Sequence, residues 1–455
     1  MILLSPADWA AHQGKFIALW TDAQYAYALY QPQQLVAVEL VEGAYPTLPH
    51  PGANWYQRLA HDLNGHKALG ATDTRPSIEH FRTPDFTAPW PEFISPEVEG
   101  VHQLAVGPIH AAIIEPGHFR FSLRGEEVLK LEARLGYAHK GTLALMRGKS
   151  PRLAARFAAR VSGDATVAHS LAFAQAAETA LDTAPPARAV YLRAIMAELE
   201  RLANHTSDIG AIAADAGFAF LDARFALARE NICAACAIAF GHRLMMDIVV
   251  PGGVAGDIMP EGAAAIIDAL SALESELPSL TRVFEDYASL QDRLIGTGII
   301  SPALAEAYHP GGYVGRASGQ AHDARAQPGY PPYLDHPIHM PVQHEGDVAA
   351  RLRIRLDEIP ESIRLIRNWL QTLPTDALAY ALPQTSGMGL GVAESFRGPV
   401  WHWLHIESGA ITTAFIADAS ALHWPLLEHA ATTGILADFP LINKSINASY
   451  SGVDL

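Results

Sequence analysis

Apolar residues recur every three or four positions along most of the chain after Thr142, and this period predicts a mainly helical core. The tracts are rich in Ala, Leu and Glu, which favour helices. Residues 301–344 are rich in Gly, Pro and His and predict a loop region, while the tail from Trp424 shows no regular pattern. The predicted helical tracts are residues 153–181, 188–214, 218–248, 260–295 and 348–370.

Strict alternation of apolar and polar residues predicts short strands in the rest of the chain. It occurs at residues 23–38, 118–124 and 400–416, and residues 55–63 suit one or two helical turns. Gly125-Glu126 offers a turn after the second of these strands, and residues 104–114 are expected to supply its partner in a hairpin.

A proline-rich stretch at residues 72–96 divides the chain, because its five prolines exclude a helix and predict a connecting strap. We therefore expect two domains, residues 1–95 and 96–455. The fold class is α+β: a small N-terminal α/β domain and linker, then a mostly helical core with small peripheral β-sheets.

Composition narrows the class of protein. The 455 residues are 49% hydrophobic, enough for a substantial core, and carry 32 basic against 48 acidic residues, a net charge of −16 that disfavours nucleic acid. Two cysteines exclude a disulfide framework. The most apolar stretch is split by Gly241-His242-Arg243, and the N-terminus lacks the basic region of a secretory signal. A cytoplasmic protein, free or docked, is expected.

Three motifs precede and enter the first helical tract. They are GPIHAAIIEPGHFRF at residues 107–121, GYAHKG at residues 136–141 and RVSGDATVAH at residues 160–169. Asp164 and His169 lie five residues apart, about 500° around a helix, and would not share a face. Ser162-Gly163 is expected to break the helix and free Asp164 to point elsewhere. The histidines and Glu115 of the first motif form either a proton relay or an ordinary polar turn.

Together and in this order, the motifs resemble the large subunits of group 4 membrane-bound nickel–iron hydrogenases and the 49-kDa subunit of respiratory complex I, the NADH-quinone oxidoreductase. The resemblance spans residues 104–416. Residues 50–80 look like a shortened complex I 30-kDa subunit. The further motifs that carry the resemblance are ELERLANH (198–205), GHRLMMDIVVPGGV (241–254), RASGQAHDAR (316–325), EGD (345–347) and ESFRG (394–398).

The cysteines depart from the hydrogenase pattern, in which four thiolates from two Cys-x-x-Cys pairs hold nickel and iron. Ser162 and Ala165 stand where the first pair is needed, and no cysteine follows Cys236. The chain therefore resembles a cysteine-less, energy-converting hydrogenase-related branch and is not expected to be a functional hydrogenase. Cys233 and Cys236 share a helix face, and core packing is the simpler interpretation. We predict no metal site.

The resemblance also implies candidate site residues. His118 matches the complex I histidine that binds the quinone headgroup, and His169 is a second candidate quinone ligand, whereas the quinone-binding tyrosine falls near Gly163. Asp164 is expected next to His118, where it would pass protons. Arg397, in ESFRG, matches the arginine over the hydrogenase metal site and would polarise a substrate oxygen or pair with Asp164. Glu115 resembles a hydrogenase proton-exit glutamate. A purely structural ion-pair network is the alternative for His118, Asp164, Arg397 and Glu115.

The implied function is that of an oxidoreductase subunit in a membrane-associated, complex I-like complex without nickel and iron. Quinone is the implied ligand of a quinone-type or proton-transfer cleft. An iron–sulfur small subunit resembling the complex I 20-kDa subunit would complete this cleft, and antiporter-like membrane subunits would translocate protons or another ion. The chain would lie peripherally on the cytoplasmic face of the inner membrane. The alternative is a catalytically silent scaffold that couples a redox module to membrane subunits; a stand-alone monomer is not expected.

Overall fold

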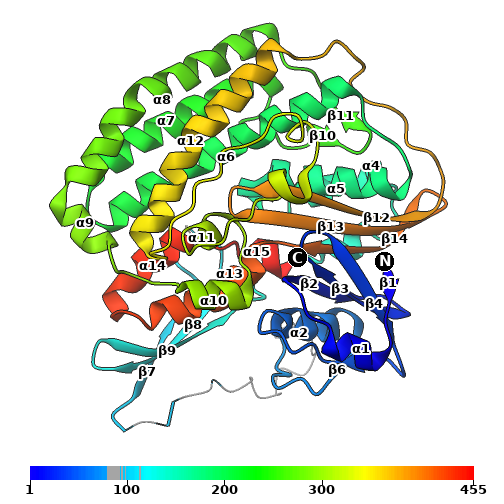
Figure 1. Ribbon diagram of the computed structural model, residues 1–455, viewed down its shortest axis with the longest axis horizontal. Helices are drawn as coiled ribbons and strands as arrows, with labels where there is room; N and C mark the ends of the chain where they lie inside the picture. Colours follow the sequence, from blue (N-terminus) through cyan, green and yellow to red (C-terminus); the bar gives the residue numbers. More distant parts are fainter. Residues whose placement is uncertain (79–92, 94–95, 98, 112–113) are drawn as a thin grey trace.

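Four long helices form the core of the computed structural model, which describes residues 1–78, 93, 96–97, 99–111 and 114–455. Figure 1 shows them side by side on one side of the molecule. The predicted 218–248 tract ends early because Gly241 adopts a left-handed conformation (φ 76°). The 260–295 tract is interrupted at Tyr287. The helices are α6 (Ala187–Asp215), α7 (Ala219–Phe240), α8 (Pro260–Asp286), followed by the short α9 (Ala288–Leu294), and α12 (Val348–Gln371).

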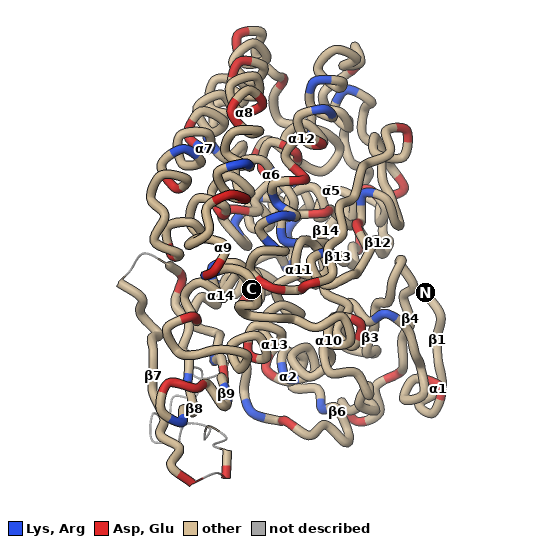
Figure 2. Tube along the Cα trace, turned by 60° about the vertical axis from the view of Figure 1, so that its left-hand side comes forward, with Lys and Arg blue, Asp and Glu red and all other residues tan. Residues whose placement is uncertain are grey.

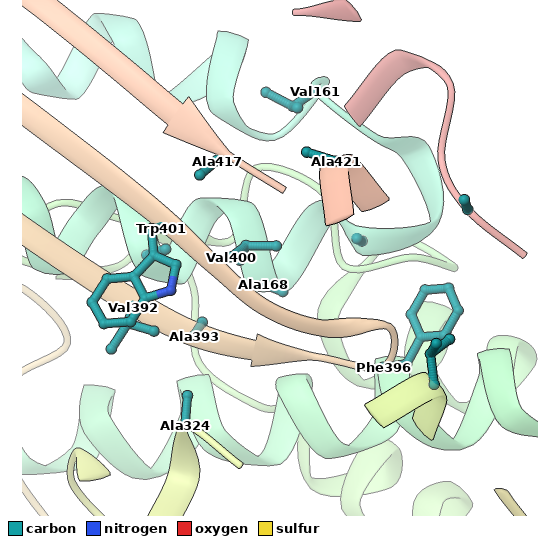
Figure 3. Close-up of a cluster of buried hydrophobic side chains, with 14 of the residues drawn as sticks. Val161, Ala168, Ala324, Val392, Ala393, Phe396, Val400, Trp401, Ala417 and Ala421 are labelled. Carbon is teal, nitrogen blue, oxygen red and sulfur yellow. The ribbon is translucent and has the colours of Figure 1, made fainter. Parts of the chain in front are cut away.

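A three-stranded antiparallel sheet lies beside this bundle, with β12 (Gly387–Ser395) paired to β13 (Gly398–Glu407) and β13 paired to β14 (Ala410–Ala417). Sequence alternation predicted β13 and β14 but not β12. Helix α5 (Thr166–Ala180) lies against β12. Figure 3 shows Val392 and Trp401 of this sheet within a buried cluster that also contains Ala168 of α5.

Close approach between α5 and β12 depends on small residues on both elements. Gly387, Gly389 and Gly391 face one side of the strand, since alternate residues of a strand share a face. A Cβ atom at these three positions would lie 2.1, 2.0 and 2.1 Å from the carbonyl oxygens of Ala180, Ala176 and Ala172 respectively. The helix backbone therefore occupies the space of a side chain.

We expect Gly389→Ala to destabilise the protein by about 3 kcal/mol, the upper end for overpacking, because the new methyl group meets backbone that cannot rotate away. Thermal unfolding of the purified protein measures this. Gly256→Ala is the control, because a Cβ atom there meets nothing within 4 Å. Equal melting temperatures for the two variants would contradict the packing argument.

The N-terminal unit is a four-stranded sheet in the order β1-β4-β3-β2. It packs against the central sheet through aromatic rings: Trp20 stacks on Phe415 with centroids 4.7 Å apart, and Tyr27 lies 5.1 Å from Trp403. The predicted strap lies largely outside the described residues, so the boundary at residue 95 stays a prediction. The elements are β1 (Ile2–Leu3), α1 (Pro6–Ala11), β2 (Phe16–Thr21), β3 (Tyr25–Tyr30), β4 (Gln34–Glu39), β5 (Ala44–Pro46), α2 (Ala53–Asn64) and β6 (Lys67–Leu69).

A second small sheet carries the first motif. The predicted turn at Gly125-Glu126 is present. The partner strand was expected within residues 104–114, but the observed strand ends at Val106, where pairing stops. Residues 107–111 and 114–117 lie in a loop, and the structure does not describe residues 112–113. The strands are β7 (His102–Val106), β8 (His118–Arg124) and β9 (Glu127–Arg134).

The tail from Trp424 is helical, so the expectation of an irregular tail was wrong. The first of these helices, Ser420–Ala431, is buried on most sides and so shows little of the period from which helices are predicted. The other two, Phe439–Ile446 and Ser451–Asp454, are too short for a period to stand out. Short helices also occur within the predicted 301–344 loop. The remaining elements are α3 (Thr142–Met146), α4 (Pro151–Ala158), β10 (Val249–Val250), β11 (Gly253–Val254), α10 (Pro302–Tyr308), α11 (Gly312–Arg316), α13 (Ser420–Ala431), α14 (Phe439–Ile446) and α15 (Ser451–Asp454).

Candidate functional site

The site begins at a break between α4 and α5. As the sequence predicted, the first helical tract does not continue through Ser162-Gly163, and a single 3-10 turn at Gly163–Ala165 separates the two helices. Lys140, from the GYAHKG motif, donates from Nζ to the carbonyl oxygens of Arg160 and Val161, at 2.7 and 3.0 Å. Lys140 therefore stabilises the break, and the residues of the break are not held in α-helical geometry.

Asp164 leaves this break and forms a two-bonded ion pair with Arg397. The guanidinium nitrogens Nη1 and Nη2 donate to Oδ1 and Oδ2 at 2.9 and 2.5 Å, which is the fork geometry that fits a carboxylate. Ser162 Oγ adds a donor to Oδ1 at 2.7 Å. The pairing that was one of two expectations for these residues is present.

The ion pair has an asymmetric environment. The Arg397 side chain is 3% exposed and that of Asp164 is 41% exposed, so the carboxylate is the accessible end. Burial alone would raise the pKa of Asp164, but the guanidinium and the Ser162 hydroxyl lower it below the ordinary value. Burial disfavours the charged form of Arg397 and lowers its pKa, but the Asp164 carboxylate has the larger effect, so the pKa of Arg397 is raised. Asp164 is therefore a carboxylate at neutral pH.

A cavity of about 340 Å³ lies over the ion pair. Glu115, from the 107–117 loop, contributes to its wall and accepts a hydrogen bond from the Ser451 backbone N–H at 3.0 Å. The structure thus brings together three predicted residues, Glu115, Asp164 and Arg397. The other lining residues are Ile114, Ser162, Gly163, Asn443, Lys444, Asn447, Ala448, Ser449 and Tyr450.

His118 is not among the residues that line this cavity. Its ring lies 5.2 Å from that of Phe93, and its Nε2 is buried without a hydrogen-bond partner in the described part of the chain. Burial and the nearby Arg120 lower the pKa of His118, which favours neutral imidazole. The expected adjacency of Asp164 and His118 is therefore not seen, since the carboxylate is occupied by Arg397 and Ser162.

His169 is a core residue. It is 0% exposed, and its Nε2 and Nδ1 lie 3.0 and 3.1 Å from Asp418 Oδ2 and His402 Nε2. Burial would raise the pKa of Asp418, but its contacts with His169 and Arg397 lower it. Within this chain His169 has no surface for a quinone, contrary to its prediction as a ligand, and it sits behind the site next to Asp418.

The C-terminal segment supplies the part of the site that sequence reasoning missed. Asn447 ends α14 in a left-handed conformation (φ 45°), and its carbonyl oxygen accepts a 2.5 Å hydrogen bond from Arg397 Nε. Lys444 and Tyr450 complete the same wall. Asparagine is one of the few residues that favour this conformation at a helix end. An Asn after a short apolar period was thus the available signal, but the tail was expected to be irregular.

The donor set does not fit a nickel–iron centre. No sulfur atom lines the cavity in the described residues, and Ser162 bonds Asp164 and Ser449 at the position where a thiolate is required. Cys233 and Cys236 lie on α7, each 1% exposed, and burial raises the pKa of both thiols, so they are protonated core residues. Among the residues described, no group of three or more His, Cys, Asp or Glu is placed to hold a metal ion.

Comparisons with known families relate this chain to hydrogenase and complex I subunits. Residues 140–208 match the family of nickel-dependent hydrogenases, and residues 215–389 match that of the 49-kDa subunit of respiratory-chain NADH dehydrogenase. Formate hydrogenlyase subunit 5 of Escherichia coli is 27% identical over 92% of this chain and 78% of its own length. NADH-quinone oxidoreductase subunit 4 of Thermus thermophilus is 28% identical over 68% of this chain and 76% of its own.

A solved structure has the same fold. A chain of the membrane-bound sulfane sulfur reductase, an archaeal respiratory membrane complex, superposes with a TM-score of 0.73 at 23% identity and covers 79% of this chain and 100% of that one. The chain therefore carries domains of the complex I 49-kDa and nickel-dependent hydrogenase families, on the fold of a respiratory membrane complex subunit. Its relatives are subunits of membrane-bound hydrogenases and complex I-like respiratory complexes. Within the described residues, every helix is too short or too polar to cross a membrane.

Proposed function

We propose that this chain is a subunit of a membrane-associated, complex I-like respiratory complex in which the Asp164–Arg397 cavity serves as a quinone-type or proton-transfer cleft without nickel and iron. The observation that carries the proposal is a carboxylate with a paired guanidinium at the wall of a cavity without sulfur. A carboxylate can exchange a proton with a bound molecule, and a guanidinium can stabilise negative charge on a ligand oxygen. Lys444 adds a second cation to the same wall.

The missing thiols support the absence of nickel. A nickel–iron centre of the hydrogenase type requires four thiolates, and the whole chain has two cysteines, both buried on α7 away from the cavity wall. The cavity-lining oxygen and nitrogen groups suit a polar organic headgroup better than a soft-ligand metal site. A quinone would be the substrate of this cleft, and an iron–sulfur cluster in a partner subunit would supply its electrons.

The surroundings of the cavity support a partner subunit there. Ile109 and Ile114, in the loop that contributes Glu115, are 76% and 42% exposed, and such side chains are commonly covered in an assembly. The proposed partners are an iron–sulfur subunit over this opening and antiporter-like membrane subunits beyond it. The chain would then lie peripherally, on the cytoplasmic face of the inner membrane.

Metal and quinone analysis of the purified native complex tests the proposal. We expect iron from the partner's cluster, nickel far below one atom per copy of this chain, and saturable binding of a soluble quinone analogue. A Cys233→Ala/Cys236→Ala chain is the matched control, since we expect it to leave the iron content and quinone binding unchanged. Stoichiometric nickel that is lost in this control would overturn the proposal. A complex that binds no quinone and is indifferent to Asp164→Asn would instead be a silent scaffold.

A further inference from the structure

One face of α6 carries a polar residue at every fourth position next to the site: Glu200, Asn204 and Asp208. Residues four apart on a helix lie one above the other on the same face. Glu200 and Asp208 are 6% and 5% exposed. Polar groups this well buried require partners, and the partners show what the face does.

The first two residues of this face hold the segment that carries Asp164. Asn204 Nδ2 donates to the backbone carbonyl oxygen of Asp164 at 2.8 Å. The carboxylate oxygens of Glu200 accept the N–H groups of Val167 and Ala168 at 2.7 and 3.0 Å. Those N–H groups belong to the first turn of α5, where the backbone donors find no acceptor within their own helix. Asp164 is thus fixed at its own carbonyl group and through the helical turn that follows it.

The third residue holds the segment that carries Arg397. Asp208 Oδ1 accepts a 2.8 Å hydrogen bond from Asn447 Nδ2, and the carbonyl oxygen of the same asparagine accepts Arg397 Nε at 2.5 Å. The other carboxylate oxygen of Asp208 pairs with Arg355 Nε at 3.0 Å. Asp208 is therefore held in place by Arg355, and Asn447 links Asp208 to the guanidinium of Arg397.

We propose that Glu200, Asn204 and Asp208 are positioning residues that hold Asp164 and Arg397 at their bonding distance, so that one face of α6 fixes the geometry of the cleft. This inference rests on the proposed function and names the residues that tune the same site. The two members of the ion pair come from segments 233 positions apart in the sequence. A single rigid helix that contacts both segments is a direct way to keep their relative position within the few tenths of an ångström that an ion pair requires.

The charged surroundings of Asp164 determine the direction of the expected effect. Arg397 favours its carboxylate, whereas Asp418 disfavours it. Glu200 also faces Asp164. Burial raises the pKa of Glu200 to about 8, although the hydrogen bonds from two backbone N–H groups lower it. Tyr313, whose pKa is raised to about 12 by burial, is a neutral neighbour. Loosening the ion pair removes the main factor that lowers the pKa of Asp164, so this pKa rises.

The test is the pH dependence of quinone reduction by the intact complex, with Asn204→Ala and Asp208→Ala as variants. Turnover that needs the Asp164 carboxylate is lost as pH falls through its pKa, so we expect the acid limb of the profile to move to higher pH. A displacement of the pair also lowers turnover by up to about 100-fold. Asp208→Asn, whose amide oxygen can still accept from Asn447, is expected to restore most of the wild-type profile.

Thr206→Val is the matched control, because Thr206 is buried on the same helix and its hydroxyl bonds only carbonyl oxygens of its own helix, Leu202 and Ala203. It should lower stability at most and leave the acid limb in place. If Asn204→Ala and Asp208→Ala behave like Thr206→Val while Asp164→Asn abolishes turnover, the positioning inference fails and the proposed function survives. If Asp164→Asn itself is silent, the proposed function fails. Should Asp208→Ala not fold, Glu200→Gln, which keeps one acceptor oxygen, takes its place and is expected to shift the limb less.

Discussion

Arg316→Met is expected to prevent accumulation of the folded chain. Arg316 is 0% exposed at the end of α11, and its guanidinium contacts three buried carboxylates: Asp323 at 3.3 Å, Glu394 at 3.2 Å and Glu358. Removing one partner of a buried ion pair costs about 3–5 kcal/mol because the remaining charge is left uncompensated. This is a large part of the about 5–15 kcal/mol that stabilises a typical protein. Soluble yield and the free energy of unfolding in denaturant measure the effect.

The large cost expected for Arg316→Met follows from the buried network of charges around Arg316. Four carboxylates (Glu198, Asp323, Glu358 and Glu394) share three guanidinium groups (Arg201, Arg316 and Arg325) in the core, where Figure 2 shows acidic and basic segments together between α6 and α11. Glu358 and Glu394 each pair with Arg316 alone among these guanidinium groups, and burial together with Asp323 raises the pKa of Glu394 to about 7. The three guanidinium groups are needed to balance the carboxylates that stay ionised, so the loss of Arg316 leaves buried negative charge uncompensated.

Two variants separate this account from a simple loss of packing. Arg353→Met removes an arginine from α12 whose partners, Glu285 and Asp357, lie at the surface, and we expect a cost of no more than about 1 kcal/mol. Adding Glu394→Gln to Arg316→Met removes one of the stranded charges and should recover part of the lost stability. A double variant no more stable than Arg316→Met alone would argue against charge as the cause.

The long helices and the break at the site could be predicted because their signals are local. The period of apolar residues fixed α6 and α12 to within two residues at each end. Ser162-Gly163 signalled the break that frees Asp164, and the resemblance of ESFRG to the hydrogenase arginine motif pointed to Arg397 as its partner. The expected fold of the hydrogenase and complex I large subunits was confirmed by the comparisons.

Features that depend on distant packing could not be predicted. Strand β12 begins with Gly-Met-Gly-Leu-Gly, a poor strand sequence on its own, and forms because β13 pairs with it and α5 requires its glycines. The wall formed by Lys444, Asn447 and Tyr450 depends on α14 and α15, which are too short for their apolar pattern to stand out along the chain. His118 was placed beside Asp164 by resemblance alone, whereas it lies at the start of β8 and is not among the residues that line the cavity.

Asp164→Asn is expected to lower quinone reduction by the complex about 10²–10⁴-fold, the range in which a positioned proton-transfer group contributes. Asparagine keeps the size of the side chain but cannot take up a proton, and it leaves the positive charge of Arg397, 3% exposed, without its carboxylate partner. Because the Asp164 pKa lies below its ordinary value, the wild-type carboxylate form persists to acid pH, so the loss is expected across the neutral range. Steady-state turnover with a soluble quinone and a low-potential artificial donor measures it.

Asp247→Asn is the matched control for this result. Asp247 forms the same two-bonded pair with Arg160, at 2.7 and 2.8 Å, but on the surface and outside the cavity wall. A surface pair contributes at most about 1 kcal/mol, so its loss should leave turnover unchanged. Equal turnover in both variants would mean that Asp164 acts only as one more ion-pair residue. A large loss confined to Asp164→Asn, with quinone still bound, would instead place the proton step at the exposed end of the Asp164–Arg397 pair.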